Sequence, residues 1–432
     1  MKTLDQIAAE LQGYDPHALP ADAVSAFLDR LVEPVTGVER VGLFDALGRV
    51  LVKDVISPIN VPPHDNSAMD GFALRGADLT PGQPLRLKIA GTALAGAAWH
   101  GRIAPGECVK IMTGAILPAG LDTVAPQELA HVEEGVVTVP ADAVRPGDNR
   151  RPLGEDLRAG QPALLKGERL MPAALGLLAS LGLADVPVAR RLRVAFFSTG
   201  DEILSPGQPP REGAVYDSNR YTLFGLLTRL GVQAIDFGTV RDQPDALRAA
   251  FTRAAAQADA IITSGGVGMG EADHTKAMMR QLGDVAFWHI AMRPGRPMAV
   301  GRIARASRDD GVKRGAALLF GLPGNPVAVM VAFLAFVRPA LLRMMGARPQ
   351  PPVLLRAVSE ELLRKKTGRT EYQRGIVTQH PDGRLSVRAA GNQGSGVLSS
   401  MVRANGLIVL GHAQGHVAAG DEVRVMMFEG VI

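Results

Sequence analysis

The chain has 432 residues, of which 47% are hydrophobic and 21% charged, which is close to ordinary globular composition. This excludes a wholly disordered or collagen-like protein, and at about 100–200 residues per domain it predicts two to four domains. The 47 basic and 43 acidic residues leave a net charge of only +4, and 4% of the residues are aromatic. The sequence therefore argues against a nucleic-acid partner and favours small anionic ligands.

Cys108 is the only cysteine, which excludes intramolecular disulfides and cysteine-cluster metal sites. Nothing near it lowers a thiol pKa, so we expect a buried, unreactive side chain. Met1–Gln6 lacks the apolar core of a secretory signal, and the longest apolar stretch, Val327–Val337, is too short to span a bilayer. These features predict a cytoplasmic protein with no membrane partner.

The N-terminal part of the chain contains one clear helical stripe. Within residues 20–34 the apolar side chains of Val24, Phe27, Leu28 and Leu31 follow helical spacing, and Pro34 ends the pattern. Prolines between residues 58 and 67 exclude an interior helix and predict an ordered loop. From 82 to 144 short β-prone runs alternate with Gly and Pro turns, which predicts a small β domain. Those runs are Leu85–Ala90, Cys108–Met112 and Val136–Val139.

Residues 191–340 alternate strands with helices. The expected strands are Arg193–Phe197, Ala260–Thr263 and Ala316–Phe320, and the expected helices are Ser218–Leu230, Pro244–Ala256 and Pro326–Met345. This order is typical of a parallel sheet covered by helices on both faces. Because ligands bind beyond the carboxyl ends of such strands, the turns that follow the three strands should meet in one crevice.

After residue 350 the pattern returns to strands and predicts a separate C-terminal β domain. The expected strands are Val353–Val358, Gln373–Val377, Leu385–Val387, Leu407–Leu410 and Glu422–Met427.

The segment Ser264–Asp273 is rich in glycine directly after a buried-looking strand. Glycines there allow backbone N–H groups to approach an anion, so phosphate or pterin binding and a purely structural turn are both open on this segment alone. It matches neither the Walker pattern nor the dinucleotide-binding pattern. Asp273 favours binding, since a carboxylate beside an anion cradle usually implies a metal ion between them.

Gly321–Pro326 precedes the most apolar helix. Asn325 suits the N-cap and Pro326 the first helical position, so the segment is a well-formed helix start. The same N-terminal N–H groups attract anions, and the two interpretations are compatible.

Adjacent carboxylates follow the first expected strand, in Ser198–Glu202, and Tyr216–Asn219 supplies further oxygen atoms. Neighbouring carboxylates in a crevice are costly unless a cation offsets their charge, and Mg²⁺ is the expected cation. A capping role for Asp217 or Ser218 is the alternative, and the sequence leaves it open.

Met292–Pro297 holds Arg293 and Arg296 on a stiff Pro-Gly turn, in a geometry suited to tetrahedral oxyanions. A solvated loop is the alternative. The histidines at 64, 274 and 289 have no ligand or triad spacing, and we expect structural roles for them.

Taken together, eight segments in order resemble the molybdopterin molybdenumtransferase (MoeA) family, which is similar to the E domain of gephyrin. They are Ser67–Ala73, Ile111–Ala115, Gly154–Asp156, Ser198–Glu202, Tyr216–Asn219, Ser264–Asp273, Arg293–Pro297 and Gly321–Pro326. The resemblance implies an elongated homodimeric protomer of α/β plus β class, with a MogA/MoaB-like domain and flanking β-rich domains. It implies a discontinuous linking domain (1–58 and 155–190, with helix 20–34 packed on the α/β domain), a β-rich domain (59–154), the α/β molybdopterin-binding domain (191–346) and a C-terminal β domain (347–432).

The resemblance also implies a reaction, in which molybdate enters adenylylated molybdopterin and Mg²⁺-dependent cleavage releases AMP. Partners would be a second copy of the chain, and possible further ones are the adenylyltransferase and molybdoenzyme chaperones. The catalytic positions carried over are Asp70, Thr113, Asp156, Glu202, Asp242 and Asp273, of which the last three would hold Mg²⁺. Substrate-binding positions are Asp217, Ser218, Ser264, Gly265, Gly266, Gly268, Gly270, Pro323, Gly324, Asn325 and Pro326. Molybdate-binding positions are Arg293, Arg296, Arg374 and Ser400.

This chain departs from the family pattern at several positions near these segments. Gly268 and Ala328 stand where serine is common, and Arg293 and Arg296 where lysine is common. Two possible hydroxyl donors are lost and the donor geometry changes, so the preference between molybdate and tungstate is open. A molybdopterin adenylyltransferase is one alternative, although the chain has about 270 residues beyond the α/β domain. A non-catalytic scaffold is the other, which the retained acidic positions disfavour.

Overall fold

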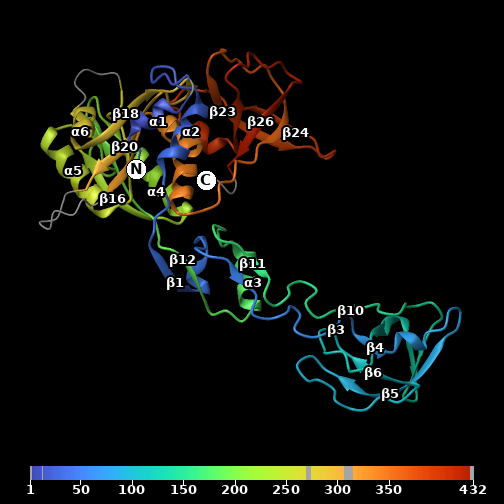
Figure 1. Cartoon of the computed structure of the whole chain (residues 1–432). Coiled ribbons are helices and arrows are strands. Elements are labelled where there is room, and N and C mark those ends of the chain that lie inside the picture. The colour runs from blue at the N-terminus through green and yellow to red at the C-terminus, as the bar shows by residue number, and fades with distance from the viewer. Residues whose placement is uncertain (1, 12, 269–273, 306–314, 429–432) are drawn as a thin grey trace, which may run out of the picture.

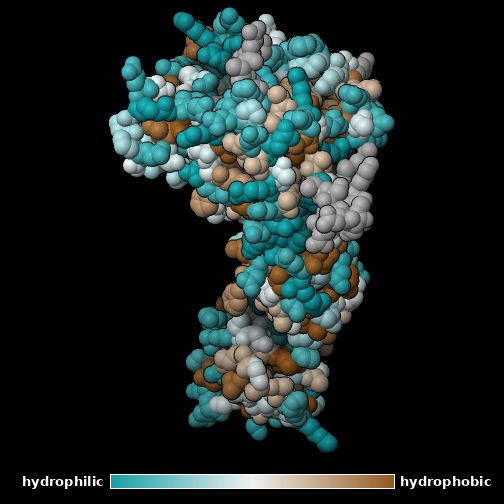
Figure 2. All heavy atoms as spheres, turned by 90° about the vertical axis from the view of Figure 1, so that its left-hand side faces the viewer, coloured by the Kyte–Doolittle hydropathy of each residue, from teal (hydrophilic) through white to brown (hydrophobic). Residues whose placement is uncertain are grey.

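The computed structural model describes residues 2–11, 13–268, 274–305 and 315–428, and it divides into two parts (Figure 1). We call residues 38–189 the arm and the remaining described residues the body. The arm leaves one side of the body and carries a small β domain at its far end. A space-filling view shows the body as a broad mass above the narrower column of the arm (Figure 2).

A six-stranded sheet forms the centre of the body, in the order β16-β13-β17-β21-β20-β18. The strands are β13 (Arg193–Thr199), β16 (Gln233–Val240), β17 (Ala260–Ser264), β18 (Gly283–His289), β20 (Pro297–Ala304) and β21 (Ala316–Leu322). The first four strands in this order pair in parallel, β20 runs antiparallel to β21, and β18 pairs antiparallel with β20. The sheet is therefore mixed, and the sequence-based expectation of a parallel sheet is correct for the four strands β16, β13, β17 and β21.

Alternation along β13 explains why both faces of the sheet are covered. Val194 and Phe196 pack into one core with α4 and the N-terminal helices, and Ala195 and Phe197 pack into the other with α5 and α6. The body helices are α1 (Leu4–Ala9), α2 (Ala21–Leu31), α4 (Asn219–Leu230), α5 (Pro244–Gln257) and α6 (His274–Leu282). Phe27 of α2 packs against Trp288, with 4.9 Å between ring centroids, so the predicted helical stripe faces the α/β sheet.

One long apolar helix crosses the first of these cores. It consists of α7 (Pro326–Ala332), a π-helical segment η4 (Phe333–Val337) and α8 (Arg338–Met344). The helix has 19 residues, and an 18-residue stretch of it has a mean hydropathy of 1.9, which by length and composition alone would suffice to cross a membrane; 72% of that stretch is buried in the protein. The apolar stretch Val327–Val337 stops at Arg338, but the helix continues, as the expected range Pro326–Met345 predicted, and its burial is that of a core helix.

The C-terminal residues form a second six-stranded sheet, in the order β19-β23-β24-β22-β26-β25, in which β23 also pairs with β25. Its strands are β19 (Met292–Arg293), β22 (Leu355–Ser359), β23 (Thr370–Gln379), β24 (Leu385–Ala389), β25 (Gly406–Leu410) and β26 (Glu422–Met427), with helix α9 (Ser399–Arg403). The extra pairing closes a barrel around a core that includes Val387 and Ile408. Strand β19 attaches the arginine segment of the α/β domain to this barrel.

The arm contains two small units. The unit nearest the body pairs β1 (Val38–Gly42) with β12 (Asp185–Ala189) and β2 (Val55–Ile56) with β11 (Pro162–Leu164), and adds η1 (Leu43–Ala46) and α3 (Pro172–Ser180). The distal sheet has the order β7-β4-β6-β5-β9-β8. Its strands are β4 (Gly71–Leu74), β5 (Leu85–Ala93), β6 (Glu107–Ile111), β7 (Thr123–Pro126), β8 (His131–Glu133) and β9 (Val136–Val139), beside η2 (Gly76–Asp78), η3 (Gln127–Leu129) and the pair β3 (Asn66–Ser67) and β10 (Arg150–Arg151).

The distal sheet buries Cys108 completely. The expected burial of this cysteine is confirmed, and burial, followed by the charge of Glu107, raises the pKa of its thiol to about 12.

Candidate functional site

A cavity of about 840 Å³ lies at the edge of the body sheet where the parallel strands end. The turns after β13, β16, β17 and β21 line it, as expected for a sheet of this type. Because β20 is antiparallel, its first residues lie at the same edge, which brings Arg296 and Pro297 to the cavity. The volume is that of a site for a whole small molecule.

Two carboxylates line the cavity on the side of β13 and β16. Glu202 folds back over Gly200, where an added Cβ would lie 2.5 Å from a Glu202 carboxylate oxygen. Asp242 follows β16, and its Oδ1 accepts a hydrogen bond of 3.0 Å from the buried hydroxyl of Thr275. The sequence predicted both residues. Asp273, the third proposed carboxylate, lies outside the described residues.

The glycine-rich turn after β17 forms the floor of the cavity. Gly265 has a φ of +94°, and a Cβ there would lie 2.5 Å from the carbonyl oxygen of Thr199. Glycine is therefore required for this close approach. Gly266, Gly268 and Val267 also line the cavity, whereas Gly270 lies outside the described residues.

Ser264 lies behind this turn and does not line the cavity. Its hydroxyl accepts a hydrogen bond of 2.7 Å from the Asn219 side-chain amide, which also donates to the carbonyl oxygen of Gly324 at 2.7 Å. Asn219 therefore connects the turn after β17 to the loop before α7 through Ser264 and Gly324.

The start of α7 supplies Pro323, Gly324 and Asn325 to the cavity wall. Asn325 occupies the N-cap position and Pro326 the first turn, as the sequence predicts, but the Asn325 side chain makes no capping hydrogen bond. Pro326 has no N–H and Val327 N donates to Ser395 O at 3.1 Å, so of the first three helical residues only Ala328, which lines the cavity, can offer its backbone N–H to an anion.

Three arginines line the opposite side of the cavity. Arg293 and Arg296 come from the predicted turn, and Arg369 comes from the barrel. The buried carboxylate of Glu371 accepts a hydrogen bond of 2.8 Å from Arg369 Nε and pairs with its Nη2 at 2.6 Å. Burial raises the pKa of Glu371, but hydrogen bonds from Gln373 and Arg369 outweigh it, so its pKa lies below the usual value. Glu371 therefore fixes a charged Arg369 at the cavity.

Arg374 and Ser400, which the sequence assigned to molybdate, occupy a different place. Both are buried, and Arg374 Nε donates to the Ser400 hydroxyl at 3.0 Å. Arg374 lines a smaller cavity of about 260 Å³ that shares Arg293 and Pro294 with the main one. Burial, with the neighbouring charge of Arg293, lowers the pKa of Arg374 to about 10.

Sequence reasoning missed Arg369 and Ser395, which line the main cavity from the barrel. Both lie within five residues of positions that it named, Arg374 and Ser400. The signal was present in the same segments, but spacing alone could not say which arginine faces the cavity.

Asp217 and Ser218 also lie outside the cavity wall. Asp217 is 3% exposed, and its carboxylate accepts hydrogen bonds from the Ser198 hydroxyl (2.9 Å) and from Arg220 N (3.1 Å). It thereby satisfies the start of α4, the role that the sequence left open as an alternative. Ser218 is the N-cap residue and makes no side-chain capping bond.

Asp70, Thr113 and Asp156 lie on the arm. Asp70 Oδ1 accepts hydrogen bonds of 2.7 Å from both the N–H and the hydroxyl of Thr113, and these bonds lower the pKa of Asp70. Asp156 is exposed in a neighbouring loop, where its N–H donates to Val61 O at 3.0 Å. None of the three lines the main cavity of its own chain.

Within the described ranges no group of three histidine, cysteine or acidic side chains lies close enough to hold a metal ion. Glu202 and Asp242 offer carboxylate oxygens at one cavity, which is the donor type that Mg²⁺ prefers, with water and substrate completing its shell.

The fold and the cavity define a multidomain protein built around a molybdopterin-binding α/β domain. Residues 195–343 match the probable molybdopterin binding domain, residues 19–182 the MoeA N-terminal region (domain I and II), and residues 356–428 the MoeA C-terminal region (domain IV). The chain belongs to the molybdopterin molybdenumtransferase (MoeA) family.

Individual relatives cover nearly the whole chain. It is 40% identical to the molybdopterin molybdenumtransferase of Haemophilus influenzae over 95% of this chain and 98% of that protein, and 35% identical to that of Nostoc over 90% and 88%. The structure is similar to a molybdopterin biosynthesis MoeA protein of Pyrococcus horikoshii, with a TM-score of 0.72 at 30% identity over 95% of this chain and 99% of that one.

Proposed function

We propose that the chain inserts molybdate into adenylylated molybdopterin, with Mg²⁺-dependent release of AMP. The observation that supports this most is the division of one cavity into an acidic side, a glycine-rich floor and a basic side. A pyrophosphate-linked pterin needs all three: a cation held by carboxylates, backbone donors for phosphate, and arginines for an oxyanion.

In this proposal Glu202 and Asp242 hold Mg²⁺ at the pyrophosphate, together with Asp273. When bound, the ion would neutralise charge that develops on the phosphate oxygens as the adenylyl bond breaks. Gly266 and Gly268, with Ala328 of the Asn325 helix start, bind phosphate through backbone N–H groups. Gly265 N instead donates to Leu322 O at 3.0 Å and holds the turn in place. These groups are fixed before substrate arrives, so no reorganisation is needed at the moment of reaction.

Arg293, Arg296 and Arg369 hold molybdate on the basic side of the cavity. Their guanidinium groups offer paired donors that suit a tetrahedral oxyanion, and Glu371 orients the third of them. Arg374 acts from the adjacent cavity, where it adds its positive charge to that of Arg293 although burial lowers its pKa to about 10.

We further propose that the protein works as a homodimer in which the Asp70–Thr113 pair completes the cavity of the partner subunit. The pair is ordered by two hydrogen bonds of 2.7 Å. It lies beside β4 and β6, whose sheet stands at the far end of the arm from the body (Figure 1). The arm also exposes large apolar side chains near the body, including Phe44, Leu47 and Met171, which a second subunit could cover.

The deciding experiment mixes the purified chain with adenylylated molybdopterin, Mg²⁺ and molybdate, and measures AMP and molybdenum cofactor together. We expect AMP release that requires both Mg²⁺ and molybdate. Absence of molybdate-dependent AMP release would refute the proposal. Formation of adenylylated molybdopterin from ATP and molybdopterin would instead support an adenylyltransferase, and inactivity in both assays would favour a scaffold.

A further inference from the structure

The arm joins the body through two chain segments that run side by side. Residues 32–37 lead out of α2, and residues 190–192 lead from β12 back into β13. Arg190 N donates to Gly37 O at 2.8 Å, which continues the ladder of β1 and β12 as far as the body. The direction of the arm is therefore set where these two segments meet the sheet.

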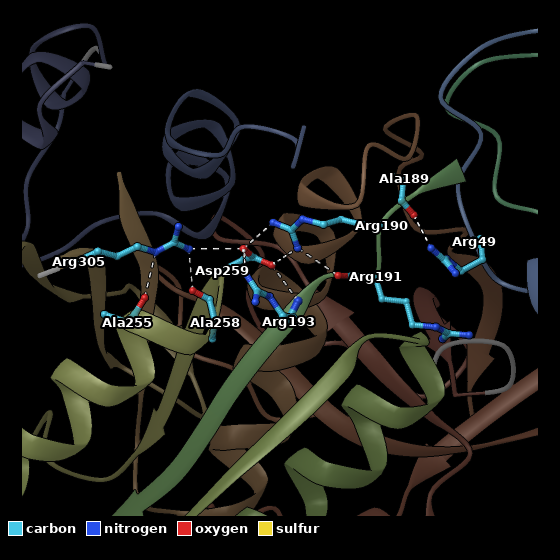
Figure 3. A network of polar contacts seen from close by, with 9 residues as sticks. All are labelled: Arg49, Ala189, Arg190, Arg191, Arg193, Ala255, Ala258, Asp259 and Arg305. Carbon is cyan, nitrogen blue, oxygen red and sulfur yellow. Dashed lines mark hydrogen bonds and ion pairs between the residues drawn. The ribbon is translucent and has the colours of Figure 1, made fainter. Parts of the chain in front are cut away.

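At this junction Arg190 binds one buried carboxylate, that of Asp259 (Figure 3). Asp259 directly precedes β17, a central strand of the body sheet. Arg190 binds it through both terminal nitrogens, at 2.7 and 2.8 Å. Arg193 N donates to the same carboxylate at 3.0 Å, and Arg305 Nη2 approaches it at 3.5 Å from β20's far end. A fork of this kind fixes both the distance and the orientation of Arg190.

The residues around the fork leave it little freedom. A Cβ on Gly37 would lie 2.5 Å from Arg190 Cδ, so the Arg190 side chain passes directly over the other crossing segment. On the arm side, buried Arg49 donates to Ala189 O at 2.8 Å and pairs with Glu39, which joins the bases of β12 and β1. Two successive residues are thus fixed to different parts of the molecule. Ala189 is bound by Arg49 of the arm, and Arg190 is bound by Asp259 of the body.

The electrostatics agree with this geometry. Hydrogen bonding to Asp259 raises the pKa of Arg190. Burial raises the pKa of Asp259, but the bonds from Arg190 and Arg193 N outweigh it and lower the pKa below its usual value. The side chain of Asp259 is only 6% exposed, so water screens the pair weakly.

We infer that Arg190 and Asp259 are positioning residues that fix the angle of the arm relative to the body. Other contacts reach the arm from the body: Arg169 Nη2 donates to Leu230 O at 3.1 Å, and Arg348 N donates to Gly167 O at 2.9 Å. Both are single bonds to carbonyl oxygens, and Arg348 Nη1 also pairs with Glu168 at a longer 3.9 Å on a more exposed part of the surface. The Arg190 fork differs from these contacts because it is short, two-pronged, made to a buried carboxylate and placed on the crossing segment itself. Without it the arm swings about that segment, and the Asp70–Thr113 pair at its far end loses its defined position.

The test measures the arm directly and does not depend on the proposed reaction. Nitroxide labels are placed at Ala179→Cys on α3 and Ala249→Cys on α5, which are exposed positions in the arm and the body, while buried Cys108 stays unlabelled. Pulsed dipolar spectroscopy then gives the distribution of distances between them. We expect Arg190→Gln to broaden this distribution and shift its maximum. Gly37→Ala should do the same without a change of charge, because it displaces the Arg190 side chain.

Arg343→Gln is the matched control, since it removes an arginine–aspartate pair of 2.7 Å to Asp29 within the body. It should leave the distribution narrow. A distribution for Arg190→Gln and Gly37→Ala as narrow as that of the unaltered chain would overturn the inference. Equal broadening in Arg343→Gln would do so too, because the effect would then be general loosening. If Arg190→Gln fails to fold, the distance distribution of Gly37→Ala decides the question. Thermal unfolding then shows whether Gly37→Ala is folded.

Discussion

The cavity of the body and the Asp70–Thr113 pair of the arm are two polar sites built in different ways. The cavity takes its residues from five strand ends and from the barrel, so its geometry depends on the packing of the whole body. The Asp70–Thr113 pair joins two neighbouring loops of a small β sheet through two hydrogen bonds. The first is a cavity lined within one chain, whereas the second lines no part of that cavity and, in the proposed dimer, completes the cavity of the partner.

The largest effect should come from the acidic side of the cavity. Asp242→Asn removes a proposed Mg²⁺ ligand, and we expect loss of AMP release on the order of 100-fold or more, as for other charge-stabilising groups in active sites. Direct Mg²⁺ titration by calorimetry should show weakened binding in the same variant. Asp245→Asn, an exposed aspartate in the first turn of α5, is the control and should retain activity. Full activity of Asp242→Asn would remove it from the proposed metal site.

A mixing experiment tests whether the arm completes the partner's cavity. Asp70→Asn and Asp242→Asn should each be inactive as homodimers. In a randomly reassembled equal mixture, half the dimers are mixed and each has one intact composite site, so activity should return to about one quarter of the unaltered level. No recovery on mixing, with mixed dimers shown by mass spectrometry, would place both residues in one chain's site or exclude Asp70 from it.

The structure places Arg369 at the main cavity, whereas the sequence assigned molybdate binding to Arg374, and substitution of each arginine distinguishes the two assignments. A charged hydrogen bond contributes about 1.5–3 kcal/mol, so Arg369→Ala should raise the KM for molybdate by roughly 10- to 100-fold. Glu371→Gln should raise it less and leave kcat nearly unchanged, since the arginine remains but loses its orientation. Arg374→Ala is the comparison, and its main effect should be on thermal stability, because the side chain is buried against Ser400. A larger KM effect for Arg374→Ala would favour the sequence-based assignment.

The smallest effect concerns the pH dependence of the stability of the body. Asp259 and Glu371 have lowered pKa values in the folded body. Their stabilisation is therefore fully present above the unfolded values of about 4 and is lost as the pH falls through the lower folded values. Chemical unfolding followed between about pH 6 and 3 should show the body losing stability, and Asp259→Asn should reduce this pH dependence. An unchanged slope in Asp259→Asn would contradict the assignment.

The pattern of neighbouring residues in the sequence was enough to predict much of the fold. Strand β17, helix α4 and helix α5 lie within one or two residues of their expected bounds, because alternating apolar runs, prolines and glycines mark them. Strands β16, β18 and β20 and helix α6 were missed. Direction within a sheet is also invisible to local pattern, so the antiparallel edge formed by β20 and β18 could not be foreseen.

The sequence by itself determined the family, the order of elements and the loops that line the cavity, since each follows from residues close together in the chain. Only the tertiary structure decided which side chains share a site. Arg369 rather than Arg374 reaches the main cavity because the register of β23 and the closure of the barrel choose between them. The same holds for Arg190 and Asp259, which lie 69 residues apart and meet only where two crossing segments reach the central strand.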